Sequence, residues 1–260
     1  MDPSAARARF LASFAGRVGL APEVLHVPGS TVVATEHRAG SGVAVCYWIG
    51  RHAVLWCDPA VVDTVRTAAA EWVGGTLAVP AAAVSDLLVG AGFGHVEDAD
   101  MCVLATDPPA PSCPEGYHER RLSDGEPADV DLIRAFTARS DPAEVEEAAL
   151  DDLDDFAETA IDVLVDDGPD SDHIVAYASA AAWDWDPVLA DIGVLVDRGH
   201  RGRGLARFVV AGCAAALLHD GRVPLYRHAH SNLGSARVAR SVGFAPVTTL
   251  AFYRLPGRTP

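Results

Sequence analysis

The chain has 260 residues, half of them hydrophobic, and a formal net charge of −16. Its length and apolar content allow a sizeable core, whereas so acidic a protein is poorly suited to nucleic acid, whose phosphates need a basic surface. The sequence contains no lysine, so all 20 Lys and Arg positions are arginine. This excludes P-loop nucleotide binding and lysine Schiff-base chemistry.

Cysteine usage and apolar runs point to a compartment. The cysteines are far apart and form no C-x-x-C pair, which is typical of reduced thiols and predicts neither a disulfide framework nor a metal site. The longest apolar runs, such as 208–218, are shorter than the roughly 20 residues that cross a bilayer. The N-terminus also lacks the pattern of a secretion signal. We therefore expect a cytoplasmic protein with no membrane partner.

Helices and strands alternate in the first part of the chain. Apolar spacing predicts strands over 31–36, 43–49 and 52–56 and helices over 4–17 and 81–89. The second and third strands are expected to form a hairpin around Gly50 and Arg51. Asp58 and Pro59 predict a further helix that extends to residue 73, with Asp58 as its N-cap.

A proline-rich segment over 106–116 predicts a linker between two units. We accordingly expect an N-terminal α/β unit over 1–105 and a second domain over 117–260. A short internal echo suggests that the first unit is a degenerate copy of the second, because Gly92-Phe93 and Gly243-Phe244 each follow an apolar helix and precede an apolar strand.

The second part predicts a mixed α/β sheet. Strands are expected over 118–122, 173–184, 191–196, 223–230 and 248–254, and helices over 129–138, 205–218 and 234–242. Another helix is expected from Asp141 onward, with Val145, Ala149, Leu153, Phe156, Ala160 and Leu164 on its buried face. Its acidic rim either attracts a cationic amine or is an ordinary solvated face.

The stretch 190–218 joins a strand, a loop rich in glycine and arginine, and an alanine-rich helix. Free backbone N–H groups at such a helix start, together with the positive end of the helix dipole, favour a phosphate. Positive charge gathers around the same turn from Arg198, Arg201, Arg203 and Arg207. This stretch therefore predicts a phosphorylated cofactor.

Two motifs sharpen that prediction. Residues 201–206 have the form R-x-x-G-x-A, and Asn232, Ser235, Val238 and Gly243-Phe244 follow the pattern N-x-x-S-x-x-V…G-F. With these motifs, residues 118–255 strongly resemble the GNAT superfamily of acyl-CoA-dependent N-acetyltransferases. The resemblance implies a mixed, mainly antiparallel sheet flanked by helices, preceded here by the smaller α/β unit.

The resemblance also implies acetyl-CoA as the co-substrate and no metal. The contacts it implies come from Val194, Leu195, Val196, Arg201, Gly202, Arg203, Gly204, Leu205, Ala206, Asn232 and Ser235. A dinucleotide-binding fold is the competing interpretation, but Arg207 occupies the place of its third glycine and Asp220 precedes the next strand.

Acetyl transfer to an amine needs a base, because an alkylammonium is almost fully protonated at neutral pH. Asp191 is the first candidate and His230 the second, with Asp184, Asp186 and His228 also near the expected thioester. Many members of the family carry a tyrosine that protonates the departing thiolate where this chain has Ala239. Water or Ser235 can take that role; alternatively, Ser235 is a helix cap.

The function predicted from the sequence is acetyl transfer from acetyl-CoA directly to a primary amine of a small molecule or peptide. The acidic composition favours a cationic acceptor. The alternative, suggested by Ala239, is a non-catalytic acyl-CoA sensor or regulatory protein. Whether the chain forms a homodimer is left open.

Overall fold

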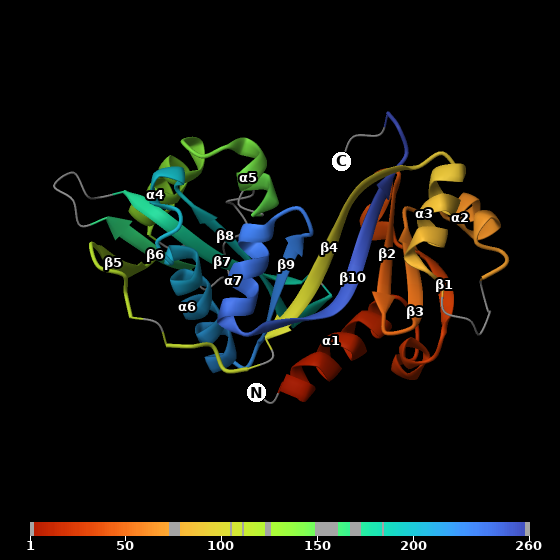
Figure 1. The fold of residues 1–260 in the computed structure, drawn as a ribbon, viewed down its shortest axis with the longest axis horizontal. Helices are drawn as coiled ribbons and strands as arrows, with labels where there is room; N and C mark the ends of the chain where they lie inside the picture. The colour runs from red at the N-terminus through yellow and green to blue at the C-terminus, as the bar shows by residue number, and fades with distance from the viewer. Residues whose placement is uncertain are drawn as a thin grey trace. The chain divides into compact units, whose positions relative to one another are not determined.

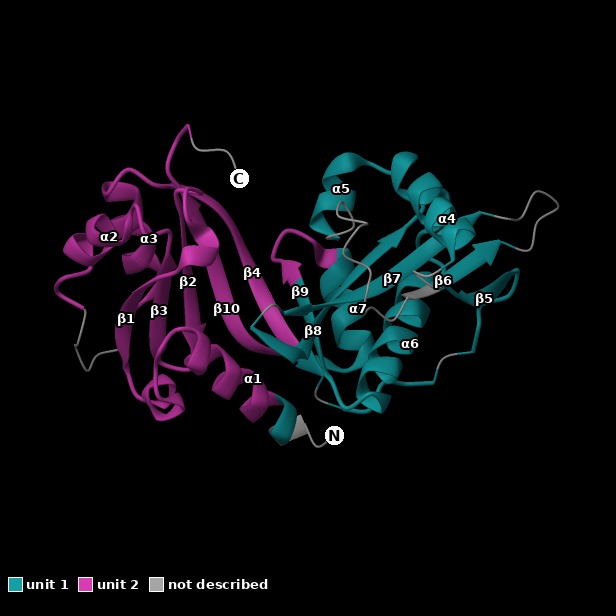
Figure 2. Cartoon of the chain, turned by 180° about the vertical axis from the view of Figure 1, so that it is seen from behind, with its two compact units in different colours: residues 1–6, 103–227, 234–245 teal, residues 7–102, 228–233, 246–260 magenta. Residues whose placement is uncertain are grey.

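The computed structural model describes residues 3–72, 79–104, 106–110, 112–122, 126–148, 161–166, 173–183 and 185–257. The chain forms two compact units (Figures 1 and 2). The N-terminal unit comprises residues 7–102, 228–233 and 246–260, and the C-terminal unit comprises residues 1–6, 103–227 and 234–245. Both units are discontinuous in sequence. The domains predicted over 1–105 and 117–260 are each continuous in sequence, and their boundaries stay a prediction.

A mixed sheet carries the N-terminal unit. Its strands lie in the order β1-β3-β2-β10-β4. Their bounds are β1 Gly29–Ala34, β2 Val43–Ile49, β3 His52–Cys57, β4 Gly94–Leu104 and β10 Phe244–Arg254. β1 is parallel to β3, whereas β2 is antiparallel to both β3 and β10. The helices are α1 Pro3–Arg17, α2 Val62–Ala68 and α3 Ala81–Gly90, with short 3-10 turns at Pro22–His26 and Glu36–Arg38.

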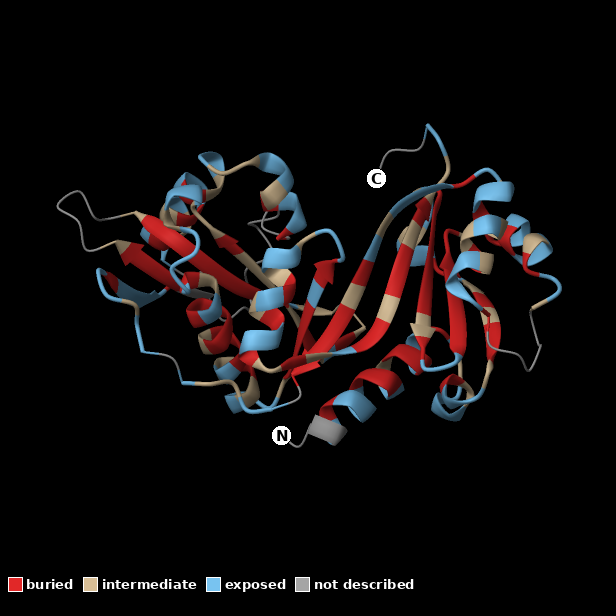
Figure 3. Cartoon of the chain, in the orientation of Figure 1, coloured by how far each residue is buried: buried red, intermediate tan, exposed pale blue. Residues whose placement is uncertain are grey.

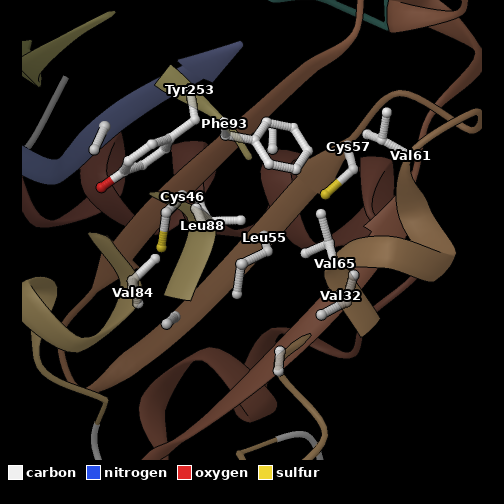
Figure 4. Packing of buried hydrophobic residues seen from close by; sticks show 14 of the residues in the cluster. Val32, Cys46, Leu55, Cys57, Val61, Val65, Val84, Leu88, Phe93 and Tyr253 are labelled. Atoms are coloured by element: carbon white, nitrogen blue, oxygen red, sulfur yellow. The ribbon is translucent and has the colours of Figure 1, made fainter. Parts of the chain in front are cut away.

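Both faces of this sheet are covered at β2 and β3. On one face the Phe14 ring of α1 lies 4.8 Å from the Tyr47 ring and 6.1 Å from the Trp56 ring, between ring centroids. On the other face Leu55 packs in one cluster with Leu88 of α3 (Figure 4). Successive strand side chains point to opposite faces. Because both faces are covered, the sequences of these two strands are nearly continuous apolar runs.

The C-terminal unit has strands in the order β9-β8-β7-β6-β5. Their bounds are β5 Tyr117–Arg121, β6 Ile161–Asp166, β7 Ile174–Trp183, β8 Asp186–Val196 and β9 Val223–Ala229. The neighbours from β5 to β8 pair antiparallel, and β8 pairs parallel with β9. The helices are α4 Pro127–Ala138, α5 Pro142–Glu147, α6 Leu205–His219 and α7 Leu233–Val242, with a 3-10 turn at Arg198–His200.

The core of this unit lies on both faces of β7, whose residues 174–180 are all buried (Figure 3). Tyr177 of β7 and Leu195 of β8 are opposite each other in the register and pack in one cluster with Phe136 of α4 and Val145 of α5. α6 contacts β6, β7 and β8 through a second set of buried residues. The predicted mixed, mainly antiparallel sheet flanked by helices is confirmed.

The prediction for Asp58 is wrong. α2 begins at Val62, and Val61 is its N-cap. The buried Asp58 carboxylate instead accepts the N–H of Gly42 at 2.6 Å and that of Ala60 at 2.9 Å. Asp58 therefore ties the start of β2 to the turn after β3, a long-range contact that competes with local capping.

The helix predicted to bury Leu164 is also wrong. α5 ends at Glu147, and Leu164 lies in the centre of strand β6. Residues 163–165 are consecutive buried apolar residues between β5 and β7, which is the pattern of a strand covered on both faces. The other positions predicted for that face, Ala149, Leu153, Phe156 and Ala160, lie outside the described residues.

Candidate active site

The two parallel strands of the C-terminal unit pair over only a short register. Leu189, Ala190 and Asp191 of β8 lie opposite residues 223–225 of β9. β8 continues to Val196 and β9 to Ala229, beyond the parallel register recorded for the described residues. One backbone edge of β8 at residues 194–196 is therefore outside that register. Such an edge can hydrogen-bond an extended ligand.

The loop after β8 prepares the start of α6 for an anion. Gly202 and Gly204 have φ of 78° and 82°, a left-handed conformation that favours glycine. The first helical hydrogen bond of α6 runs from Phe208 N–H to Gly204 C=O at 3.1 Å. The N–H groups of Leu205 and Ala206 thus come before that ladder, at the positive end of a 15-residue helix. This geometry suits a phosphate group.

Two acids, one at the N-cap of α5 and one within the helix, hold two arginines of the loop. Arg201 donates to Glu144 at 2.7 Å, and Arg198 donates to Asp141 at 2.7 Å and to Glu144 at 3.4 Å. The hydrogen bond from Arg201 is the largest cause of a lowered pKa at Glu144. The positive charge predicted at this turn is therefore partly compensated. The local concentration of acids over 141–147 was the only sequence sign of these pairs.

Arg203 takes a different partner. It donates to the hydroxyl of Tyr117 at 2.7 Å and to the carbonyl of Gly199 at 3.3 Å. Arg207, in the first turn of α6, has an exposed side chain. Of the four predicted arginines, three are thus oriented by the protein itself, which fixes the loop's conformation around its N–H groups.

Asp191 lies where the parallel register ends. Its carboxylate accepts backbone N–H groups of Ile192 and Arg227, yet burial is the stronger influence and raises its pKa. On β8 its side chain shares a face with Gly193 and Leu195, the face covered by α4 and α5. A carboxylate with a raised pKa beside a ligand edge is a suitable proton acceptor.

Gly193 explains how closely α5 approaches that face. A Cβ atom at this position would lie 2.0 Å from the carbonyl oxygen of Ala148, which follows α5. Only glycine therefore lets the end of α5 lie against β8, two residues from Asp191. α5 is thus packed against β8 near Asp191, and it is ion-paired to the loop between β8 and α6.

Ser235 lies in the first turn of α7, and its hydroxyl is 2.9 Å from the hydroxyl of Tyr226 on β9. Asn232 directly precedes that helix. Ala239 is buried in α7 and has no hydroxyl to offer. Sequence reasoning missed Tyr226, because nothing local marks one buried strand tyrosine as the partner of a helix serine nine residues later.

The remaining candidates have other surroundings. His230 belongs to the N-terminal unit, where its Nε2 lies 3.2 Å from Asp100. His228 is buried there with its Nε2 3.9 Å from Cys102 Sγ. Asp186 begins β8 and accepts the N–H of Val188 at 3.1 Å. Asp184 lies outside the described residues. Asp191, Ser235 and the loop after β8 belong to the C-terminal unit, whereas Asn232 belongs to the N-terminal unit.

Part of the chain matches a known protein family. Residues 130–244 match the model of the acetyltransferase (GNAT) family. No curated protein matches the sequence. Among the described residues, no helix is long and apolar enough to cross a membrane.

Solved structures share the fold. The most extensive similarity among three of them is to a tandem GNAT protein from the clavulanic acid biosynthesis pathway, with a TM-score of 0.56, 14% identity and coverage of 94% of this chain and 93% of that one. A GNAT-family acetyltransferase from Colwellia psychrerythraea gives a TM-score of 0.51 at 11% identity over 77% and 76%.

A GCN5-related N-acetyltransferase from Kribbella flavida gives a TM-score of 0.50 at 19% identity over 66% of this chain and 63% of that one. The match thus spans less than two thirds of the Kribbella protein. At these identities the structures show a common fold, and the family model supports acyl transfer as the general chemistry. The segment that carries the phosphate loop, residues 130–244, is a GNAT acetyltransferase domain.

Proposed function

We propose that the protein transfers an acetyl group from acetyl-CoA directly to a primary amine. The observation that carries this proposal is the combination of a parallel strand pair whose register ends at Asp191 with an anion-binding loop at the start of α6. Together they offer an extended edge for an amide-rich chain and N–H groups for a pyrophosphate, which are the two recognisable parts of coenzyme A.

Each part of the donor has residues to contact it. Backbone N–H groups of Gly202, Gly204 and Ala206 bind the pyrophosphate, and Arg201 and Arg203 shape the loop and add charge. Leu205 adds a further backbone contact to the pyrophosphate. Along β8, the backbone of Val194, Leu195 and Val196 pairs with the pantetheine arm. Asn232 and Ser235 lie at the start of α7 and complete the predicted donor site.

Asp191 serves as the proton acceptor. The ammonium of the acceptor first loses a proton to Asp191, directly or through water, and Asp191 releases it to solvent. The neutral amine then attacks the thioester carbonyl carbon, a C–N bond forms, the C–S bond breaks, and Asp191 takes the second proton lost by nitrogen. Its raised pKa makes it a stronger base than an exposed aspartate. The departing thiolate takes a proton from water, or from solvent through the hydroxyl of Ser235, which gives up one proton and regains another; that hydroxyl lies 2.9 Å from the hydroxyl of Tyr226. His230 remains the second candidate base.

The acceptor is a small molecule or peptide with a cationic amine. The net charge of −16 favours the approach of a cation over that of an anion. Dependence on acetyl-CoA and the reduced cysteines favour the cytoplasm as the site of the reaction.

Calorimetric titration with acetyl-CoA tests the donor site. Gly204→Trp should abolish binding, because a bulky side chain at φ 82° both strains the loop and covers its N–H groups. Gly221→Trp is the matched control, since Gly221 has φ 75° and open space around it but lies in the turn between α6 and β9. Equal affinity in the two variants would sink the loop assignment.

A panel of amines, followed by release of free thiol, tests turnover. Acetylation of at least one cationic amine by the wild-type chain supports the proposal. Tight binding of acetyl-CoA without turnover of any amine contradicts it.

A further inference from the structure

Three side chains with metal-ligating atoms meet at one end of the C-terminal sheet. Asp166 ends β6, His173 precedes β7, and His200 lies in the loop after β8. One ligand atom from each lies within 4.8 Å of the others, and all three residues are partly exposed. The residues come from three separate places in the chain, so no sequence spacing reveals them.

The register of the sheet explains why they meet. Val165 of β6 pairs with Ile174 of β7, and Asp166 and His173 are the next residues beyond that pair at the two strands' ends. The N–H of Asp197 donates to the carbonyl of Val175 at 2.9 Å, which holds the loop after β8 against the start of β7. His200 follows three residues later.

The imidazole of His200 is oriented by a second set of contacts. Its Nδ1 is 3.0 Å from the hydroxyl of Tyr117, a buried residue that lies opposite Asp166 in the register of β5 and β6. Arg203 donates to the same hydroxyl at 2.7 Å. With Nδ1 engaged, Nε2 remains to serve as a ligand atom. Metal-binding histidines typically have one nitrogen fixed in this way.

We propose that Asp166, His173 and His200 bind a divalent transition-metal ion of the Zn²⁺ class. Two imidazoles and one carboxylate form a donor set suited to Zn²⁺ rather than to Mg²⁺ or Ca²⁺, which prefer oxygen alone. Zn–N bonds of about 2.0–2.1 Å draw ligand atoms closer than 4.8 Å, a contraction that partly exposed side chains make by rotation. With three protein ligands, a further position stays open to water or another small ligand.

Zinc titration of the full-length, untagged chain, freed of metal by a chelator, tests the site. We expect one equivalent of Zn²⁺ to bind, and Co²⁺ in its place to give the intense visible absorption of a tetrahedral site. His173→Ala and Asp166→Asn should lose this binding. His219→Ala, which changes an exposed histidine at the end of α6, is the matched control and should keep it.

Tyr117→Phe sharpens the test, because it removes only the contact that orients His200. Its zinc affinity should fall by about 10- to 100-fold, the usual effect of losing such a partner. Circular dichroism of the metal-free variants checks that each is folded. The proposal is overturned if the folded wild type takes up no stoichiometric zinc, or if His173→Ala and Asp166→Asn bind zinc as well as His219→Ala does.

Discussion

The two units use carboxylates that lie within their sheets in opposite ways. In the N-terminal unit, Asp58 is almost fully buried and accepts two backbone N–H groups that join the start of β2 to the turn after β3. In the C-terminal unit, Asp191 lies where the pairing of β8 with β9 ends, and burial raises its pKa despite its N–H partners. The first carboxylate accepts backbone N–H groups that hold two parts of the fold together, whereas the second lies next to the edge of β8 outside the parallel register. An acid within a sheet thus becomes a candidate for catalysis when strand pairing ends next to it.

Asp191→Asn should have the largest effect on activity. Loss of the proton acceptor is expected to lower kcat by about 10²- to 10⁴-fold, with little change in the affinity for acetyl-CoA. The pKa of Asp191 is raised, so the folded protein binds its proton more tightly than the unfolded chain does. This carboxylate therefore lowers stability as pH rises through its folded pKa.

Thermal unfolding and steady-state kinetics check both consequences. Asp191→Asn should unfold at no lower temperature than the wild type at pH 7. In the wild type, activity should fall as pH drops through the raised pKa of Asp191. A variant with full activity would move the role of base to His230.

Asp58→Ala should produce the converse result. It leaves the N–H groups of Gly42 and Ala60 without their acceptor, at a cost of about 2–4 kcal/mol in the free energy of unfolding. Urea denaturation measures that loss. At temperatures where the variant is folded, kcat should be unchanged. A kcat that falls together with stability would break the contrast between the two acids.

Gly193→Ala tests whether close packing of α5 belongs to the site. The added Cβ would meet the Ala148 carbonyl oxygen at 2.0 Å, so α5 must shift, at about 1–3 kcal/mol. KM for the amine should rise because Asp191 lies on the same face of β8. Gly90→Ala, in α3 of the other unit with open space around it, is the control and should leave both quantities essentially unchanged.

Glu144→Gln should have the smallest effect. The pairs it removes are partly exposed, so the loss of stability should stay below about 1 kcal/mol. Arg201 becomes available to phosphate, whereas Arg198 keeps its bond to Asp141. The affinity for acetyl-CoA should rise severalfold at low salt and converge with that of the wild type at high salt. Glu146→Gln, an exposed acid of the same helix, is the control. Unchanged affinity at low salt would show that the ion pairs do not compete with the ligand.

The ion pairs of Glu144 should persist to a pH below the ordinary pKa of a glutamate. Because the pKa of Glu144 is lowered from its ordinary 4.5, its contribution to stability is present above that value and is lost as pH falls through the lower folded pKa. Comparing the acid unfolding of wild type and Glu144→Gln measures this. Curves that separate only above pH 4.5 would contradict the pairing.

The strand, loop and helix over 190–218 were predictable from sequence because their requirements are local. Gly202 and Gly204 provide the left-handed turns, and the helix follows at once. Contacts between distant residues were not predictable. The pair Arg201–Glu144 and the pair Tyr226–Ser235 depend on which strand faces which helix.

Spacing also misled in two places. Leu164 falls at helical intervals from Val145, but strand pairing on both sides decides its conformation. Asp58 has the position of a helix cap, yet Gly42 competes for its carboxylate. In both cases a tertiary partner overrides a preference that the local sequence expresses.

The pairing of β10 with β2 joins segments that are far apart in the sequence. Residues 249–254, almost the last of the sequence, find their antiparallel neighbours at 43–48, in the first quarter. A fragment that began at the proline-rich linker would carry β10 without β2 and would expose the hydrogen-bonding edge of an apolar strand, which promotes aggregation. The last strand of the sequence therefore needs a segment from the first quarter of the chain to complete its sheet.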